Sequence, residues 1–148
     1  MTSADEDVRD AVRQAQRFRR VRDAHQMELA EDYVELIADL IEQTGEARVV
    51  DLAGRLGVTN ATVNNTIQRL QRDGLVTSKP YRSIFLTEQG QALAVTARER
   101  HRVVRDFLTA LGVDAETADA DAEGLEHHVS DATLDAFRSY LRRERRAR

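Results

Sequence analysis

Apolar residues recur at helical intervals along most of the chain. Between residues 25 and 45, Leu29, Tyr33, Leu36 and Leu40 follow one another at spacings of three or four positions. That period places them on one face of an α-helix. Gly45 comes directly after this stripe, and glycine commonly ends a helix because it adopts the left-handed conformation at low cost. The pattern predicts a long amphipathic helix that ends there.

A short helix, a turn and a second helix are predicted next along the chain. Apolar positions precede Gly57, and Thr59 is a favourable N-cap for the following helix, which ends near Gly74. Residues 75–87 then alternate as two short strands, with Pro80 at the turn between them. This order is the winged helix-turn-helix plan, whose second helix reads DNA.

The remainder of the chain is predicted to be helical. A long helix over residues 87–112 carries Leu93, Ala97, Val104 and Leu108 on one side. A short acidic helix near residues 115–122 follows, and a last helix begins at about Asp131. The predicted fold class is therefore mainly α, with an N-terminal winged helix-turn-helix and a two-stranded wing followed by an all-helical domain.

These patterns suggest three regions. Residues 1–25 form a weakly patterned, helix-compatible N-terminal extension, residues 26–92 the winged helix-turn-helix domain, and residues 93–148 the helical domain. The final residues, RRERRAR at 142–148, are expected to be disordered.

Composition limits the class of protein. The chain has 148 residues, is 41% hydrophobic and contains no cysteine, so a packed core is expected without disulfides or thiolate ligands. It has no apolar run of the ~20 residues that a membrane span needs, and its acidic N-terminus does not resemble a signal peptide. The sequence therefore predicts a cytoplasmic protein with no membrane partner.

The net charge of −4 conceals two oppositely charged regions. Residues 48–85 contain six basic residues against two acidic ones, whereas residues 110–135 contain eight acidic residues and no lysine or arginine. An anionic partner is expected for the first region and a cationic partner for the second.

The basic region carries side chains suited to reading DNA. Asparagine and glutamine bond adenine, and arginine bonds guanine or phosphate. The candidate DNA-binding residues of the second helix and the wing are Thr59, Asn60, Thr62, Asn64, Asn65, Gln68, Arg69, Arg72, Lys79 and Arg82, with Tyr81 between the last two. A solvated helix face gives the same pattern, and winged helices also bind proteins, but the adjoining wing and the local positive charge favour DNA.

The acidic region carries oxygen and nitrogen ligands at helical spacing. Glu123, Glu126 and His127 stand at i, i+3 and i+4, which is one face of a helix. Asp32 and Glu35 have a similar spacing on the first long helix.

His101 stands in the long helix predicted over residues 87–112, one turn from Ala97 and Val104, so it can face inward. Each segment alone is typical of an ordinary surface or a hydrogen-bonded histidine, and His128 is interpreted as structural. Together they predict a site for a divalent cation, with Mn²⁺ or Fe²⁺ favoured and Zn²⁺ an alternative.

At these residues the sequence resembles a known family. The segments EDYVELIADLIEQTGEARVVDLAGRLGVTNATV, YRSIFLTEQG, RERHRVVRDFL and DAEGLEHHVS are similar to the manganese-responsive members of the diphtheria-toxin-repressor family. The resemblance covers about residues 25–140. It implies a homodimeric, metal-activated repressor that binds a double-stranded DNA operator, in which residues 93–148 form a helical dimerisation and metal-binding domain.

The resemblance also implies a binuclear site. By motif, its ligands fall on Asp32, Glu35, His101, Glu123, Glu126 and His127, and two Mn²⁺ ions per subunit are expected, with Fe²⁺ or Zn²⁺ activating weakly or not at all. Iron-responsive relatives carry a sulfur-containing residue where Glu126 stands and add a C-terminal SH3-like domain, which is not expected here. Both differences favour manganese, and no organic small-molecule ligand is expected.

Other functions stay open on the sequence alone. One is an iron-responsive regulator of the same family. Another is a di-metal carboxylate enzyme, although residues 47–87 are committed to a winged helix, so no enzyme activity is expected. A third is a metal-free winged helix whose acidic segment binds a basic protein.

Overall fold

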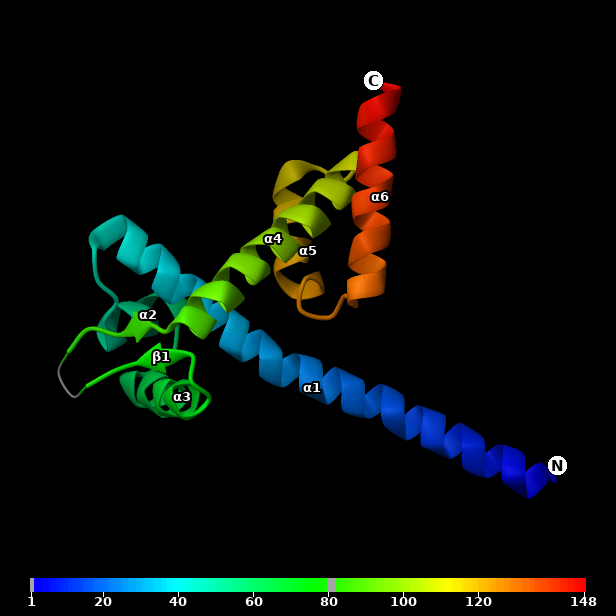
Figure 1. Ribbon diagram of the computed structural model, residues 1–148, viewed down its shortest axis with the longest axis horizontal. Coiled ribbons are helices and arrows are strands. Elements are labelled where there is room, and N and C mark those ends of the chain that lie inside the picture. The colour runs from blue at the N-terminus through cyan, green and yellow to red at the C-terminus, as the bar shows by residue number, and fades with distance from the viewer. Residues whose placement is uncertain (1, 80–81) are drawn as a thin grey trace.

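The computed structural model describes residues 2–79 and 82–148, and the chain forms two lobes joined by crossing helices (Figure 1). Within the described residues there are six helices and one two-stranded sheet. The predicted mainly α fold class is confirmed. None of the described helices is both long and apolar enough to cross a membrane.

The first lobe is the predicted winged helix-turn-helix. Helix α2 (Val49–Leu56) ends at Gly57, and α3 (Asn60–Arg72) begins after Thr59, whose side chain accepts a hydrogen bond from the Thr62 backbone. Strands β1 (Val76–Thr77) and β2 (Phe85–Leu86) pair antiparallel to form the wing. The predicted turn at Pro80 and Tyr81 lies outside the described residues.

Helix α1 (Ser3–Thr44) is continuous over 42 residues and ends at Gly45, whose φ is +84°. Its C-terminal part packs into the first lobe. Residues 3–23 are exposed and extend away from the rest of the molecule (Figure 1). The predicted limit of the N-terminal extension at residue 25 thus falls inside one helix, and the division of the chain into domains stays a prediction.

The core of the first lobe is apolar and draws on every element of that lobe. Burial of such side chains contributes roughly 1.5–3 kcal/mol each, so this core accounts for much of the stability of the lobe. Its buried members are Ala30, Tyr33, Ile37, Leu40, Ala47, Leu52, Ala53, Val63, Ile67, Leu70, Val76 and Ile84.

Helix α4 (Glu88–Ala110) connects the lobes. Its first turn lies directly against the wing, and a Cβ atom at Gly90 would collide with the carbonyl oxygen of Leu75. Further along, Arg98 of α4 forms ion pairs with Asp39 and Glu42 of α1. The orientation of α4, and with it the second lobe, is therefore tied to α1.

The second lobe consists of α5 (Ala115–Leu125) and α6 (Asp131–Ala147) packed on α4. Its small core contains Val103, Val104, Ala122 and Leu134, and Phe107 stacks on Phe137 with ring centroids 3.9 Å apart.

Two expectations for this lobe were wrong. Helix α5 extends past residue 122, and the tail at 142–148 is helical to Ala147 rather than disordered. Arginine is a good helix former, so the tail continues the helix that begins at Asp131.

Candidate metal centre

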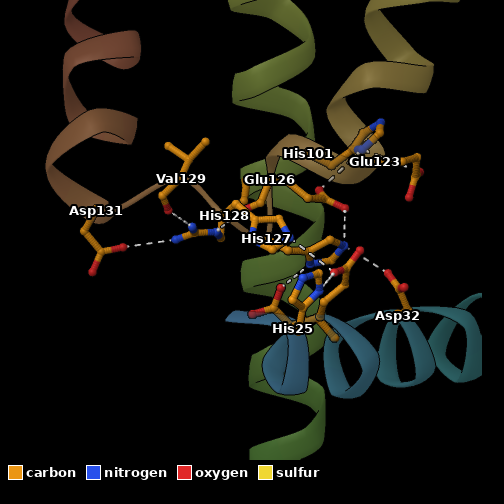
Figure 2. Close-up of polar contacts among 12 residues, drawn as sticks. His25, Asp32, His101, Glu123, Glu126, His127, His128, Val129 and Asp131 are labelled. Atoms are coloured by element: carbon orange, nitrogen blue, oxygen red, sulfur yellow. Dashed lines mark hydrogen bonds and ion pairs between the residues drawn. The ribbon is translucent and has the colours of Figure 1, made fainter. Parts of the chain in front are cut away.

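Three segments bring acidic and imidazole side chains together where the two lobes meet. They are α1 near residues 25–35, the middle of α4 at His101, and the end of α5 with the turn that follows it, at residues 123–128 (Figure 2). The turn lies against both helices, so residues about 100 positions apart in sequence are in contact.

Glu126 lies at the centre of the group. Its side chain is 1% exposed and its two oxygens point to different histidines. Oε1 is 3.3 Å from Nε2 of His127, and Oε2 is 3.4 Å from Nδ1 of His101. One carboxylate therefore joins two neighbouring sets of ligand atoms.

The first set contains His101, Glu123 and Glu126, and one ligand atom from each lies within 4.8 Å of the others. Nδ1 of His101 is 3.5 Å from Oε1 of Glu123. The other ring nitrogen, Nε2, is 2.8 Å from a carboxylate oxygen of Asp119. When Nε2–H donates to Asp119, Nδ1 keeps its lone pair free toward Glu126.

The second set contains Glu28, Asp32 and His127, again within 4.8 Å. Nε2 of His127 is 3.0 Å from Oδ1 of Asp32. Its Nδ1 is 2.6 Å from Oε2 of Glu31, which orients the ring in the same way that Asp119 orients His101. Both histidines thus direct one nitrogen at Glu126 and the other at a carboxylate.

The buried polar atoms of this group lack hydrogen bonds. Among the described residues, the buried side-chain nitrogen and oxygen atoms without a partner are Nδ1 of His101, both oxygens of Glu126 and Nε2 of His127. Leaving a buried polar atom without a hydrogen bond lowers the stability of the fold by ~1–3 kcal/mol. Four such atoms that face one another therefore indicate a ligand that binds all of them. Carboxylate oxygens and imidazole nitrogens are ligands for a divalent cation, and these residues fit such an ion.

Burial and the neighbouring charges shift the pKa values of these groups. Burial raises the pKa of Glu126 to about 8, and the carboxylates of Glu35, Glu123 and Asp32 add to this, against the opposing effect of His127. Burial opposes the charged form of His127, but the nearby carboxylates of Asp32 and Glu31 outweigh burial and raise its pKa to about 10. The group therefore holds protons that a cation would replace.

Arg100 holds the turn in place. Its guanidinium donates to the backbone oxygens of Glu126, at 3.0 Å, and of Val129, and it pairs with Asp131 at 3.1 Å (Figure 2). The two bonds to backbone oxygens attach the turn to α4 independently of the side chains of the metal centre. The position of Glu126 is therefore set by the backbone.

Five of the six predicted metal-ligating residues lie in these sets, and Glu35 does not. Glu35 is half-buried nearby on α1, and burial followed by the charges of Glu123 and Asp39 raises its pKa. The helical spacing of Glu123, Glu126 and His127 is interrupted because α5 ends at Leu125 and His127 lies in the turn. His128, predicted to be structural, contacts Glu28 at 3.3 Å.

Sequence reasoning missed several residues of the centre. Glu28 lies one helical turn before Asp32, and Asp119 one turn before Glu123, so the i, i+4 spacing was available as a signal for both. Glu31 likewise lies one helical turn before Glu35. Its contact with His127 and the contacts of Arg100 were not predictable, because they depend on how the turn packs on α1 and α4.

The candidate DNA-binding residues lie mostly on the outer face of α3 and on the wing. Thr59, Asn60, Thr62, Asn64, Asn65, Gln68, Arg72, Lys79 and Arg82 are exposed. Arg69 is half-buried and lines a groove toward α1 and α4 with Asp23 and Gln26. Gln71, not among the candidates, lines a groove with Lys79 and Arg82, and its side-chain amide lies 3.4 Å from the Ser78 carbonyl oxygen.

Comparison with known families matches both lobes. Residues 25–84 match the iron dependent repressor, N-terminal DNA binding domain, and residues 87–146 match the iron dependent repressor, metal binding and dimerisation domain. The chain belongs to this family. It is the diphtheria-toxin-repressor family that the sequence motifs resemble, so the chain is a metal-dependent transcriptional regulator with DNA and a second copy of itself as partners. The alternative of a di-metal enzyme is thereby excluded.

Individual relatives agree with this assignment. The chain is 55% identical to "Transcriptional regulator MntR" of Escherichia coli O6:H1 over 126 residues, covering 85% of this chain and 81% of that protein. It is 54% identical over 123 residues to "Transcriptional regulator MntR" of Salmonella typhimurium, covering 83% and 78% of the two chains.

A solved structure of a manganese-dependent transcriptional repressor in complex with manganese matches with a TM-score of 0.68 and 32% identity. The match covers 76% of this chain and 52% of that one, so this chain spans about half the length of the solved relative.

Proposed function

We propose that this chain is a manganese-responsive, homodimeric repressor of genes of manganese homeostasis. Two Mn²⁺ ions per subunit are held by Asp32, Glu35, His101, Glu123, Glu126 and His127, and Fe²⁺ or Zn²⁺ activates weakly or not at all. DNA is read by the exposed face of α3 and by the wing. The relatives named as manganese regulators and MntR support the choice of metal.

The observation that carries the proposal is the position of Glu126. Each of its oxygens faces a histidine nitrogen that has no hydrogen bond, and carboxylates on Asp119 and Glu31 keep those nitrogens available. A single buried carboxylate between two imidazoles fits two adjacent cations that share it. A cation supplies positive charge and directional bonds to several ligands at once.

The donor set favours a hard or borderline cation. Four of the six proposed ligands are carboxylates and no sulfur is present, which suits Mn²⁺ better than soft metals. Affinity alone favours Zn²⁺ over Mn²⁺. The selection of Mn²⁺ therefore lies in the number of ligands that the folded site brings together, and an iron-responsive regulator is the second candidate on the same donors.

The chain couples this centre to DNA through α1. Asp32 and Glu35 lie on the same helix as Tyr33 and Ile37, which belong to the core of the DNA-binding lobe, whereas the remaining proposed ligands lie on the second lobe. Without a cation these carboxylates repel one another across the lobe boundary. A cation that neutralises these carboxylates holds the two lobes in one orientation. It thereby sets the distance between the two copies of α3 in a dimer.

Successive major grooves lie ~34 Å apart on B-DNA, so a dimer binds DNA well only when its two α3 helices are separated by that distance. DNA and metal then strengthen each other's binding by the same factor.

The test is fluorescence anisotropy with DNA selected from a random library by the Mn²⁺-loaded protein. We expect tight binding with saturating Mn²⁺ and a drop of at least tenfold when the metal is removed by chelation. Glu123→Ala removes the Mn²⁺ response, whereas Glu116→Ala, an exposed glutamate in the same helix, leaves it intact. DNA binding that is unchanged by chelation and by Glu123→Ala contradicts the proposal.

The same assay distinguishes residues that contact DNA from residues that bind the metal. Asn65 lies at the middle of the exposed face of α3, and a bidentate base contact is worth ~1–3 kcal/mol. Asn65→Ala therefore weakens binding to the selected DNA about tenfold or more while the response to Mn²⁺ is kept.

A further inference from the structure

A third set of potential ligands shares Glu28 with the candidate metal centre, and none of its members is among the six proposed Mn²⁺ ligands. It comprises His25 and Glu28 of α1 and His128 of the turn after α5. Oε2 of Glu28 is 3.3 Å from Nδ1 of His25 and 3.3 Å from Nε2 of His128. The two imidazole rings meet edge to face with centroids 5.0 Å apart (Figure 2 shows both histidines).

The geometry of this cluster suits one cation. One ligand atom from each residue lies within 4.8 Å of the other two. The cluster is open to water, with side-chain exposures of 65% for His25, 29% for Glu28 and 33% for His128. Three protein ligands with a solvent-facing position match the coordination of zinc sites that keep one water.

The donors differ in kind from those of the neighbouring centre. Two of the three ligands here are imidazoles, whereas four of the six proposed Mn²⁺ ligands are carboxylates. Imidazole nitrogens favour Zn²⁺, Co²⁺ and Ni²⁺ over Mn²⁺. The cluster of His25, Glu28 and His128 therefore suits Zn²⁺ better than Mn²⁺, whereas the neighbouring centre is richer in the carboxylates that suit Mn²⁺.

We propose that His25, Glu28 and His128 form an additional cation site selective for Zn²⁺, with water completing the coordination. This goes beyond the proposed function, because it requires neither Mn²⁺ nor DNA. A cation here joins the part of α1 where the exposed segment begins to the turn that carries His127.

The two clusters share Glu28, which also belongs to the set with Asp32 and His127. Occupancy of the additional site commits one oxygen of Glu28 and orients His128. Zinc binding there therefore changes the Mn²⁺ affinity of the neighbouring centre, and Mn²⁺ changes the Zn²⁺ affinity by the same factor.

The experiment counts Zn²⁺ ions bound by the metal-free full chain, using equilibrium dialysis and competition with a chelator of known affinity. His25→Ala is the main variant, and His128→Gln is the second. Gln26→Ala is the matched control, because Gln26 is also exposed and is the next residue in α1. We expect both histidine variants to bind one Zn²⁺ fewer per chain than the wild type and the control. Absorption of Co²⁺ at the same site should lose the corresponding ligand-field band.

The DNA assay supplies the second readout. Mn²⁺-dependent DNA binding of His25→Ala should stay within about twofold of wild type in the absence of Zn²⁺. Equal Zn²⁺ stoichiometry and affinity in all four proteins overturns the proposal. Loss of the Mn²⁺ response together with the Zn²⁺ ion in His25→Ala also overturns it, because His25 would then belong to the manganese centre rather than to a separate site.

Discussion

The two lobes of this protein have interiors of different chemistry. The DNA-binding lobe contains a cluster of twelve buried apolar residues drawn from α1, α2, α3 and the wing. The second lobe has four buried apolar residues in its core, and Glu126 and His127 are buried next to it. Hydrophobic burial is enough to order the first lobe, whereas the second contains ionisable groups whose burial is unfavourable until they are neutralised.

This difference separates the tasks of reading and sensing. A lobe with a complete apolar core keeps the same recognition surface whether or not a cation is bound. In a lobe with buried carboxylates, the free energy of the folded state falls strongly when a cation binds. Sensitivity to metal therefore comes from the lobe with the smaller apolar core and the buried ionisable groups, and its effect reaches DNA through α1.

The largest effect is expected from a cavity in the apolar core. Ile37 is fully buried in the DNA-binding lobe, and Ile37→Ala should lower the free energy of unfolding by ~2–5 kcal/mol. Urea unfolding followed by circular dichroism measures this, with Val50→Ala at an exposed position of α2 as the control. The decrease should be the same with and without Mn²⁺. If Mn²⁺ abolished the decrease, the stability of the DNA-binding lobe would depend on the metal centre.

The next largest effect is expected on Mn²⁺ affinity, when the carboxylate of Glu126 is neutralised. Glu126→Gln keeps the shape of the side chain but removes its charge, and it should weaken Mn²⁺ binding by about a hundredfold or more. Residues that merely hydrogen-bond to metal ligands already change affinity ~10- to 100-fold. Isothermal titration calorimetry measures the change, with Glu116→Gln as control. Wild-type affinity in Glu126→Gln would remove Glu126 from the centre.

The stability of the metal-free protein should fall as pH rises from about 5 to 9. The raised pKa values of Glu126, about 8, and of His127, about 10, mean that the folded state holds protons which the unfolded chain has released in this range. Each of these two groups therefore makes unfolding more favourable as the pH rises.

Thermal unfolding at a series of pH values tests this prediction. Glu126→Gln lacks the titrating carboxyl, so the dependence below pH 8 should be weaker in that variant. A wild-type protein that becomes more stable over the same range would contradict the prediction.

The smallest effect is expected from a residue that only orients a ligand. Glu31 accepts from Nδ1 of His127 at 2.6 Å, and Glu31→Gln should weaken Mn²⁺ binding about tenfold without removing a ligand. Glu6→Gln in the exposed part of α1 is the control. An affinity loss as large as that of Glu126→Gln would make Glu31 a ligand rather than a positioning residue.

Much of the fold was predictable because helix ends depend on local chemistry. Gly45, Gly57 and Thr59 end or begin helices as their residue types predict. The exposed start of α1 and the arginine-rich end of α6 were less predictable, because they lack a buried apolar face. Residues 3–44 contain no glycine or proline, so a helix nucleated by packing near Tyr33 continues to Ser3.

The sequence by itself determined the residue types of the centre, and its helical spacing predicted one helix face with Asp32 and Glu35 and another with Glu123, Glu126 and His127. His101 was predicted on a third segment. Helical periodicity is a short-range property, so it is read directly from spacing. Tertiary structure alone decided that each oxygen of Glu126 faces a different histidine, that Glu31 and Asp119 select the free nitrogen of each ring, and that Glu28 lies between two clusters. Most of these contacts join residues far apart in the chain, and they depend on the turn, which Arg100 and the packing of α1 on α4 hold against both helices.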